Sequence, residues 1–381
     1  MYKTIYLDSA ASTKVDKNVF IKILPYFKDL YVNPSSVYRS AQKCRIAIDK
    51  SRIEISKILK CKQEEIYFTS GGTEANNWVI FGILGFFNYK NKNIITTKIE
   101  HESILNPVKE LKKKGVKINF LPVDKYGHVK IKDIGNYLDE KTALVSIMYA
   151  NNETGTVENI SEIGRFLRGK NVPFHTDSCQ ATGALSLDVD ELLVDLMTIS
   201  SSKIYGPKGV GALYVRKNIN IKPFMFGGGQ ERRMRPGTEN VAAIVGFAEA
   251  LKITEKMRKK ENIRLTKLRD DFIELLNKKI PGITLNGDPK NRLPNNINVS
   301  IKGISGESIL LRLDMEGIEA SSGSACTSGS LEPSHVLLGI GLSKEMAKSS
   351  LRMTLGRGNT WSELEKTAMV LQKIVKELRR K

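Results

Sequence analysis

The sequence has few of the residues that build metal sites and disulfide frameworks. Its 381 residues include only four cysteines and four histidines, without a CxxC pair or a metal-ligand spacing. We therefore expect no metal, and the few thiols indicate a reducing, cytoplasmic setting. The N-terminus shows no basic segment followed by an apolar one, so no secretory signal is expected.

Long apolar runs are also missing. The longest, from Trp78 to Phe87, has ten residues, two of them glycine. A membrane-spanning helix needs about 20 apolar residues. The run fits a buried helix instead, and we expect no membrane association.

Acidic residues are scarce beside basic ones, 41 against 60, which leaves a net charge of +19. Such a charge would suit an acidic partner, tRNA included. However, the basic residues are spread along the chain as KNK, KKK and RKK with little aromatic interleaving. Solvated faces explain this pattern, so we expect no direct tRNA binding, and a basic RNA-binding protein is the non-enzyme alternative.

The most informative stretch runs from Val172 to Leu213 and contains two short apolar segments, 172–174 and 194–199. Apolar runs of this length, bounded by turn residues, are typical of buried strands in a parallel sheet. Asp177 follows the first and Lys203 follows the second. Because ligands of open α/β sheets bind at the carboxyl ends of the strands, we expect both side chains to meet over one ligand.

A lysine and a carboxylate so placed suit pyridoxal phosphate, which needs an amine for its Schiff base and an acid beside its ring nitrogen. Each residue has an ordinary explanation: Lys203 is one of 60 basic residues, and Asp177 could cap a helix. The setting distinguishes Lys203, because three serines precede it and the small, turn-forming segment IYGPKGVG follows. Glycines there allow close approach of the backbone to a ligand.

Other predicted strand ends carry polar residues that face the same edge. Gly71 and Gly72 precede Thr73 at the start of a helix, where backbone amides bind phosphate, although such Gly-Gly turns also occur without a ligand. The hydroxyls of the serines before Lys203 are further phosphate donors. The remaining candidates are residues for the ring or its hydroxyl group: His101, Asn152 and Gln180.

Cys326 stands in the middle of SSGSACTSGS (321–330), where eight of ten residues are Ser, Gly or Thr. This composition cannot pack a core, so we expect an exposed loop. Free cysteine normally prefers burial. The setting favours a reactive thiol over a packing residue, whereas packing explains Cys44 and Cys61.

The order of predicted elements indicates an α/β chain with two lobes. Strands and helices alternate up to residue 150, which favours a mostly parallel sheet with right-handed crossovers. A long amphipathic stretch, 241–279, then connects to a part of different pattern with a final helix opened by the capping box of Thr360 and Glu363. We expect a large cofactor-binding domain at 13–258 and a smaller α+β domain at 1–12 and 259–381.

The sequence resembles the cysteine desulfurases of the NifS/IscS type, within the class V aminotransferase-like pyridoxal-phosphate enzymes. The resemblance covers nearly the whole chain and rests on these segments: IYLDSAAS, NPSS, FTSGGTEANN, EHESIL, SIMYANNETG, HTDSCQ, SKIYGPKGVGALYVR, GGGQERRMRPGTEN, SSGSACTSGSLEPSHVL and SSLRMTLGR. SSGSACTS is highly specific to this subgroup. The resemblance implies the type I PLP-dependent transferase fold.

The resemblance also implies a role for each matching residue. Lys203 would form the Schiff base, Asp177 would pair with the pyridine nitrogen, and His101 would stack on the ring. Gln180 and Asn152 would bind the ring hydroxyl. The phosphate would be held by Gly72, Thr73, Ser200 and Ser202, with Thr238 supplied by the second subunit of a homodimer. Asn33 and Arg352 would bind the substrate carboxylate, Arg352 through a bidentate fork.

The activity implied is conversion of L-cysteine to L-alanine, with Lys203 removing the Cα proton and Cys326 taking the sulfur as a persulfide. His101 is a candidate acceptor for the Cys326 proton. The sulfur would supply an iron–sulfur scaffold protein, tRNA thiolation, or both. The family usually has His where this chain has Ser202, which weakens the expected hold on the cofactor. Another class V activity, such as selenocysteine lyase, is the alternative among enzymes.

Overall fold

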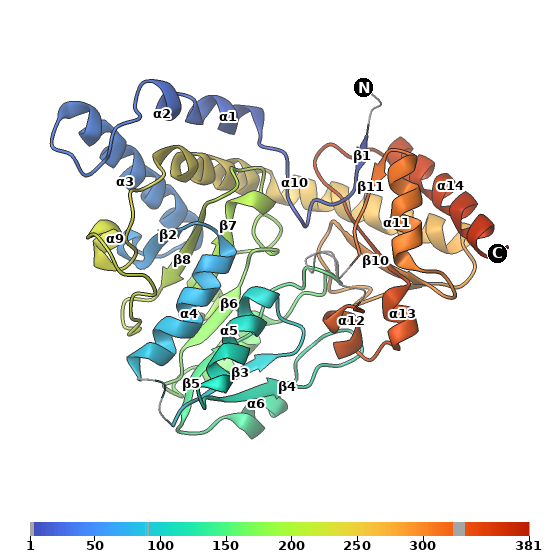
Figure 1. Cartoon of the computed structure of the whole chain (residues 1–381), viewed down its shortest axis with the longest axis horizontal. Coiled ribbons are helices and arrows are strands. Elements are labelled where there is room, and N and C mark those ends of the chain that lie inside the picture. Colours follow the sequence, from blue (N-terminus) through green and yellow to red (C-terminus); the bar gives the residue numbers. More distant parts are fainter. Residues whose placement is uncertain (1–3, 88, 90, 323–331, 381) are drawn as a thin grey trace.

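The computed structural model describes residues 4–87, 89, 91–322 and 332–380. Its larger part is built on a seven-stranded sheet (Figure 1) with the order β2-β8-β7-β6-β5-β3-β4. The strands are β2 (Ile66–Thr69), β3 (Asn93–Thr97), β4 (Lys117–Leu121), β5 (Thr142–Ser146), β6 (Phe174–Asp177), β7 (Leu196–Ser200) and β8 (Gly211–Val215). All run in one direction except β8, which is antiparallel to both of its neighbours. The predicted mostly parallel sheet is confirmed.

Helices cover both faces of this sheet because successive strand residues point to opposite sides. In β7, Met197 and Ile199 join the core cluster beneath α3 and α10, whereas Leu196 joins the cluster beneath α4 and α5. The helices and turns of this part are α1 (Lys17–Ile23), α2 (Pro25–Lys28), α3 (Arg39–Leu59), η1 (Gln63–Glu65), α4 (Gly72–Phe86), α5 (Glu102–Lys113), α6 (Ile131–Tyr137), α7 (Ile160–Leu167), α8 (Val189–Leu192), η2 (Ser201–Lys203) and α9 (Gln230–Arg233).

The boundaries of two predicted strands near the site differ from the structure, and the strand predicted at 194–199 lies at Leu196–Ser200. The predicted strand 172–174 lies at Phe174–Asp177 instead, so the strand continues through the polar residues that were expected to follow it. His175 can remain inside the strand because Ser146 and Thr198 bind its ring nitrogens at 2.9 and 3.1 Å. Burial lowers the pKa of His175 to about 4, which keeps the ring neutral. Strand β8 was not predicted.

The other part contains a three-stranded antiparallel sheet with the order β12-β10-β9 and a parallel pair of β1 and β11. Its elements are β1 (Ile5–Tyr6), β9 (Ile283–Leu285), β10 (Asn296–Ile301), α11 (Gly306–Met315), β11 (Ile318–Glu319), α12 (His335–Gly339), α13 (Lys344–Lys348), β12 (Ser350–Thr354) and α14 (Trp361–Leu378). The predicted capping box of Thr360 and Glu363 opens α14 and is confirmed.

One helix, α10 (Val241–Lys279), connects the two parts (Figure 1). Its first half packs in the core beneath the large sheet, from Val241 to Leu251, and its second half packs in the other core, from Leu265 to Leu276. The predicted helix over 241–279 is confirmed. Residue 258 lies within this continuous helix, and the boundaries 13–258, 1–12 and 259–381 stay predictions.

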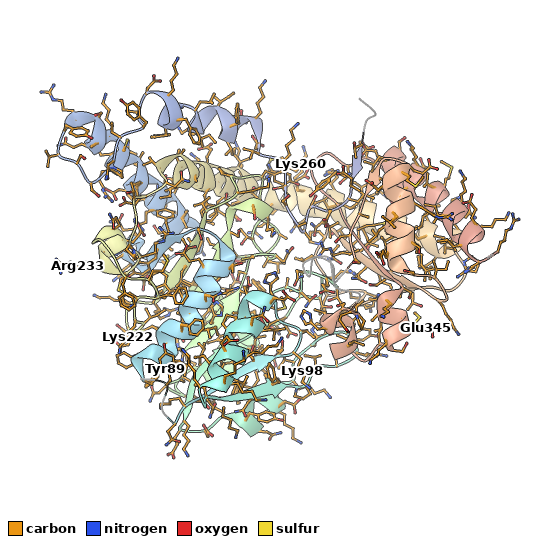
Figure 2. The ribbon with its side chains drawn as sticks, viewed as in Figure 1. Tyr89, Lys98, Lys222, Arg233, Lys260 and Glu345 are labelled. Carbon is orange, nitrogen blue, oxygen red and sulfur yellow. The ribbon has the colours of Figure 1, made fainter. Side chains whose placement is uncertain are left out.

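In the ranges that the structure describes, no helix is both long and apolar enough to span a bilayer. Figure 2 shows charged side chains, among them Lys98, Lys222, Arg233 and Lys260, reaching outward at separate places around the molecule.

Candidate active site

A cavity of about 400 Å³ lies at the carboxyl ends of the parallel strands. Its volume is within the usual range for small-molecule sites, which is about 300–1,000 Å³. Ten of the residues singled out from the sequence line it: Gly72, Thr73, His101, Asn152, Asp177, Gln180, Ser200, Ser202, Lys203 and Arg352. They come from six separate segments of the chain. The tertiary structure therefore brings together the residues that were predicted to share one edge of the sheet.

Asp177 is held by neighbours on both oxygens. Its Oδ2 accepts a hydrogen bond from Asn76 Nδ2 at 2.7 Å, and its Oδ1 accepts one from the Cys179 backbone N–H at 2.9 Å. Asn76 Nδ2 also donates to Ser103 Oγ at 2.8 Å, and Ser103 Oγ lies 2.8 Å from His101 Nδ1. The acid and the imidazole are therefore fixed by one continuous network.

Sequence reasoning missed Asn76 and Ser103. Asn76 is fully buried in α4, a helix whose other residues are largely apolar. Buried polar side chains need partners. The sequence did offer a signal for Asn76: it is a polar residue on the inner face of an apolar helix, and this helix follows two glycines.

The N-terminal end of α4 forms one end of the cavity. Its N-cap, Gly71, has φ +146°, a conformation that side chains rarely permit. A Cβ atom on Gly72 would lie 2.6 Å from Cys179 Sγ, so this position has room only for glycine. Ser200 Oγ and Ser202 Oγ lie 3.3 Å apart beside this end. Backbone amides and hydroxyls so arranged suit a phosphate.

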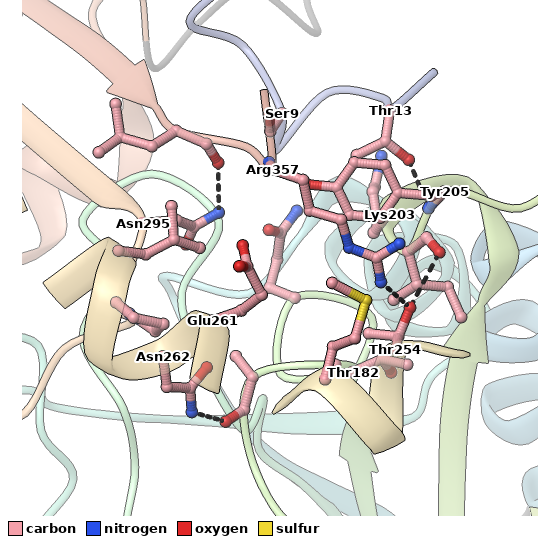
Figure 3. Close-up of a pocket in the computed structure, with 18 residues that line it drawn as sticks. Ser9, Thr13, Thr182, Lys203, Tyr205, Thr254, Glu261, Asn262, Asn295 and Arg357 are labelled. Carbon is pink, nitrogen blue, oxygen red and sulfur yellow. Dashed lines mark hydrogen bonds between the residues drawn. The ribbon is translucent and has the colours of Figure 1, made fainter. Parts of the chain in front are cut away.

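Lys203 stands between two cavities. It follows β7 in the short turn η2, and its Nζ donates to the Ala11 carbonyl oxygen. Gln180 Nε2 donates to the neighbouring Ala10 carbonyl at 3.0 Å. Both side chains also line a smaller polar cavity of about 70 Å³ (Figure 3), which has room for a few waters. The N-terminal turn thus closes one side of the site.

Arg352, on β12, lines the main cavity next to the N-terminal segment, with which β12 is paired. Its Nη2 lies 2.8 Å from Asp8 Oδ1, and its Nη1 donates to the Asn152 carbonyl oxygen at 3.2 Å. Among the described residues, the buried Arg352 Nε and the buried Asn152 Oδ1 have no hydrogen-bond partner. Because buried polar atoms are usually paired, both atoms indicate that a polar ligand belongs here.

Two predicted site residues that the structure describes, Asn33 and Thr238, do not line this cavity. Asn33 is exposed, and its Oδ1 accepts from the Ser35 backbone N–H at 2.9 Å. Thr238 is exposed on the segment after α9 and does not line the cavity of its own chain. Cys326 lies outside the described residues. The roles predicted for these three residues stay predictions.

The described cysteines are poor nucleophiles. Burial raises the pKa of the Cys44 and Cys179 thiols, and it raises the pKa of Cys61 to about 12. The thiolate is the reactive form of cysteine. At neutral pH all three side chains are therefore protonated.

Comparison with known proteins supports these observations. The family model described as aminotransferase class-V matches residues 5–367. The chain is 47% identical over 381 residues to a cysteine desulfurase IscS of Clostridium botulinum, covering 100% of this chain and 96% of that protein. It is 48% identical over 379 residues to the cysteine desulfurase IscS of Dictyoglomus turgidum, with the same coverage of both chains.

Solved structures share the fold. A NifS-like protein superposes with a TM-score of 0.93 at 33% identity and covers 99% of this chain and 100% of its own. SspA in complex with cysteine superposes with a TM-score of 0.81 at 34% identity, over 92% of this chain and 99% of its own.

The cavity fits pyridoxal phosphate. A lysine, an acid held by Asn76 and a glycine cradle at a helix N-terminus surround one space, and the partnerless Asn152 Oδ1 borders it. These are the groups that the aldehyde, the ring nitrogen, the phosphate and the ring hydroxyl require. The chain therefore belongs to the class-V aminotransferase family, whose cofactor is pyridoxal phosphate.

Proposed function

We propose that this protein is a cysteine desulfurase, which converts L-cysteine to L-alanine and keeps the sulfur on Cys326 as a persulfide. The observation that carries the proposal is the meeting of Lys203, Asp177 and Arg352 around one cavity. The full-length similarity to cysteine desulfurases and the fold shared with SspA, whose structure was solved in complex with cysteine, support the choice of substrate.

The residues of the cavity would hold the cofactor and substrate as follows. Lys203 would bind the aldehyde, Asp177 the ring nitrogen and His101 the ring face. Gln180 and Asn152 would bind the ring hydroxyl, and the α4 N-terminus with Ser200 and Ser202 would bind the phosphate. When bound, pyridoxal phosphate supplies an electron sink for the substrate Cα. The Lys203 amine takes the Cα proton, while Arg352 holds the substrate carboxylate.

Sulfur transfer is assigned to Cys326 as a proposal. The Cys326 thiolate attacks the substrate sulfur, the Cβ–S bond breaks, and Cβ gains a proton. The balance is L-cysteine plus one enzyme thiol giving L-alanine plus one enzyme persulfide. The raised pKa values of Cys44, Cys61 and Cys179 support this choice, since none of those thiols is ionised at neutral pH. His101 is proposed to accept the proton of Cys326.

We further propose that the enzyme works as a homodimer in the cytoplasm and passes its sulfur to an iron–sulfur scaffold protein or another acceptor. Large apolar side chains are exposed on α1, on α2 and on the segment between α2 and α3, at the upper left of Figure 1. They include Phe20, Phe27, Tyr31, Val37 and Tyr38. Clustered apolar exposure of this kind is typical of an association surface. In such a dimer, Thr238 of the second copy would complete the phosphate site.

The test is the formation of L-alanine and sulfide from L-cysteine by the holoenzyme, with a thiol reductant to release the persulfide. C326S should lose turnover by orders of magnitude, because a serine hydroxyl is too basic to replace a thiolate, yet it should still exchange the Cα proton of L-cysteine with solvent. C179S is the matched control and should keep the parental rate. Alanine formation at the parental rate by C326S would contradict the mechanism.

A further inference from the structure

We infer that Asp8 is a positioning residue for Arg352. Asp8 holds the guanidinium at the cavity wall and partly neutralises its charge. Arg352 can then bind the carboxylate of the substrate and still release the carboxylate of the product. This inference rests on the proposed function. The observation behind it is the partly buried ion pair between the two side chains, with Arg352 Nη2 and Asp8 Oδ1 2.8 Å apart.

The backbone fixes the position of Asp8 relative to Arg352. Asp8 forms a parallel bridge with Thr354, two residues beyond Arg352 on β12. The Thr354 backbone N–H donates to the Leu7 carbonyl at 2.7 Å, and the Ser9 N–H donates to the Thr354 carbonyl at 3.2 Å. The Ala10 N–H donates to Thr354 Oγ1 at 2.9 Å. The pair is therefore built into the joint between the N-terminal segment and β12.

The geometry leaves part of the guanidinium for a ligand. Asp8 takes Nη2 and the Asn152 carbonyl takes Nη1, whereas Nε is buried without a partner among the described residues. A planar guanidinium carries five N–H donors in a fixed fork. Because Nη1 and Nη2 each have a fixed partner, the direction of the remaining N–H donors is fixed as well.

The charge of Asp8 also acts on any carboxylate that Arg352 binds. The Arg352 side chain is 4% exposed and that of Asp8 is 19% exposed, so water screens the pair poorly. Asp8 is not among the residues that line the main cavity, and it contacts Arg352 at Nη2. A bound carboxylate thus meets a cation whose charge is already partly balanced, which limits its affinity and favours release of L-alanine.

The experiment compares D8N, which keeps an acceptor for Nη2 but removes the charge, with D8A, which removes both. We expect D8N to lower the KM for L-cysteine by about three- to tenfold, because removing a nearby negative charge strengthens the binding of a carboxylate. A charge within about 4–6 Å typically changes an ionic equilibrium by roughly one to three powers of ten before screening. L-Alanine should inhibit D8N more strongly by the same factor. D8A should have a higher KM than D8N, since nothing then orients the fork.

Two controls isolate the effect. D16N removes the same charge from another N-terminal aspartate, whose Oδ2 lies 3.3 Å from Arg357 Nη1, and should leave KM unchanged. Cysteamine has the amine and thiol of cysteine but no carboxylate, so its inhibition should be equal in the parent and D8N. A purely structural role would lower the stability of D8N and D8A without this difference between ligands.

An unchanged or raised KM in D8N, or equal KM values in D8N and D8A, would overturn the inference. Failure of the proposed function gives a different result, because the parent would then form no alanine from L-cysteine. In that case the affinity of the holoenzyme for L-alanine still tests the inference, and it is measured from the change in absorbance of the cofactor. Tighter binding to D8N than to the parent supports it, and equal or weaker binding overturns it.

Discussion

Arg235 holds the carboxylate of Glu74 at two points, with Nε 2.8 Å from Oε1 and Nη2 2.9 Å from Oε2. Glu74 lines the main cavity in the first turn of α4, and Arg235 is three residues before Thr238. Although burial alone would raise it, the hydrogen bonds from Arg235 and Ser70 hold the pKa of Glu74 below its ordinary value. The phosphate end of the cavity is thus tied to the segment that carries Thr238.

Two more ion pairs anchor this segment. Arg52 and Glu231 are both buried and 2.6 Å apart, and Arg45 lies 2.8 Å from Glu239. Glu231 and its two following residues have positive φ angles, a strained arrangement that needs such support. Thr238 nevertheless remains exposed. A rigidly held, exposed hydroxyl is what a donor to a neighbouring subunit requires.

The first prediction is that Thr238 completes the partner's phosphate site. T238A should lose cofactor on dialysis about tenfold more readily than the parent, as expected for one hydrogen bond to a charged group. A heterodimer of T238A with K203A, isolated with two affinity tags, should regain one site of parental affinity and activity, because that site combines Lys203 of one chain with Thr238 of the other. A heterodimer in which no site has the parental cofactor affinity would place Thr238 in its own chain's site instead.

The second prediction identifies the cofactor-binding lysine. Lys203 and Lys208 both line the main cavity. Borohydride reduction of the holoenzyme should attach the cofactor to Lys203, as read from the peptide masses. K203A should lose turnover on the order of 10³-fold or more, because it also loses the base, while K208A should keep the label on Lys203. A reduced cofactor on Lys208 would refute the assignment.

The third prediction concerns Ser202, at the position where the resemblance to cysteine desulfurases leads us to expect a histidine. Its hydroxyl lies 3.3 Å from that of Ser200, beside the α4 N-terminus. S202H should retain pyridoxal phosphate about five- to tenfold more tightly, because a cationic imidazole donates a charge-assisted hydrogen bond. S202N supplies a neutral donor and serves as the control. Equal dissociation constants for S202H and the parent, measured by equilibrium dialysis, would contradict the prediction.

The fourth prediction is a pH dependence of stability from the contact between His128 Nε2 and Asp288 Oδ2, which are 2.7 Å apart. Burial alone would raise the pKa of Asp288, but backbone N–H groups of Lys290 and Asn291 and the His128 ring lower it to about 2. Since the folded pKa lies below the unfolded one, the stabilisation is present above about pH 4 and is lost as the pH falls toward 2.

D288N should therefore lower the free energy of unfolding by about 2 kcal/mol at pH 7, and the difference from the parent should shrink below pH 4. Urea denaturation of the holoenzyme at several pH values measures it. D271N is the control, because its partner Lys267 is exposed and exposed pairs contribute about 0–1 kcal/mol. A difference that stays constant from pH 7 to pH 3 would show that the charge of Asp288 does not stabilise the fold.

The sequence by itself determined the elements whose cause is local. Buried strands read as apolar runs because both of their faces are covered, and α10 and the capping box of α14 followed from periodicity and cap residues. The strand ends also predicted which side chains would share one edge, and Lys203, Asp177, His101 and Asn152 do line one cavity.

Only the tertiary structure decided which distant residues touch. Asp8 and Arg352 are 344 positions apart, and their contact depends on the pairing of the N-terminal segment with β12, a strand that local pattern did not reveal. Asn76 meets Asp177 because α4 packs against the strands that carry the site. The same packing leaves Asn33 and Thr238 outside their own chain's cavity. Local preference acts over a few residues, whereas these contacts are set by the order of strands and the burial of whole faces, which no short segment encodes.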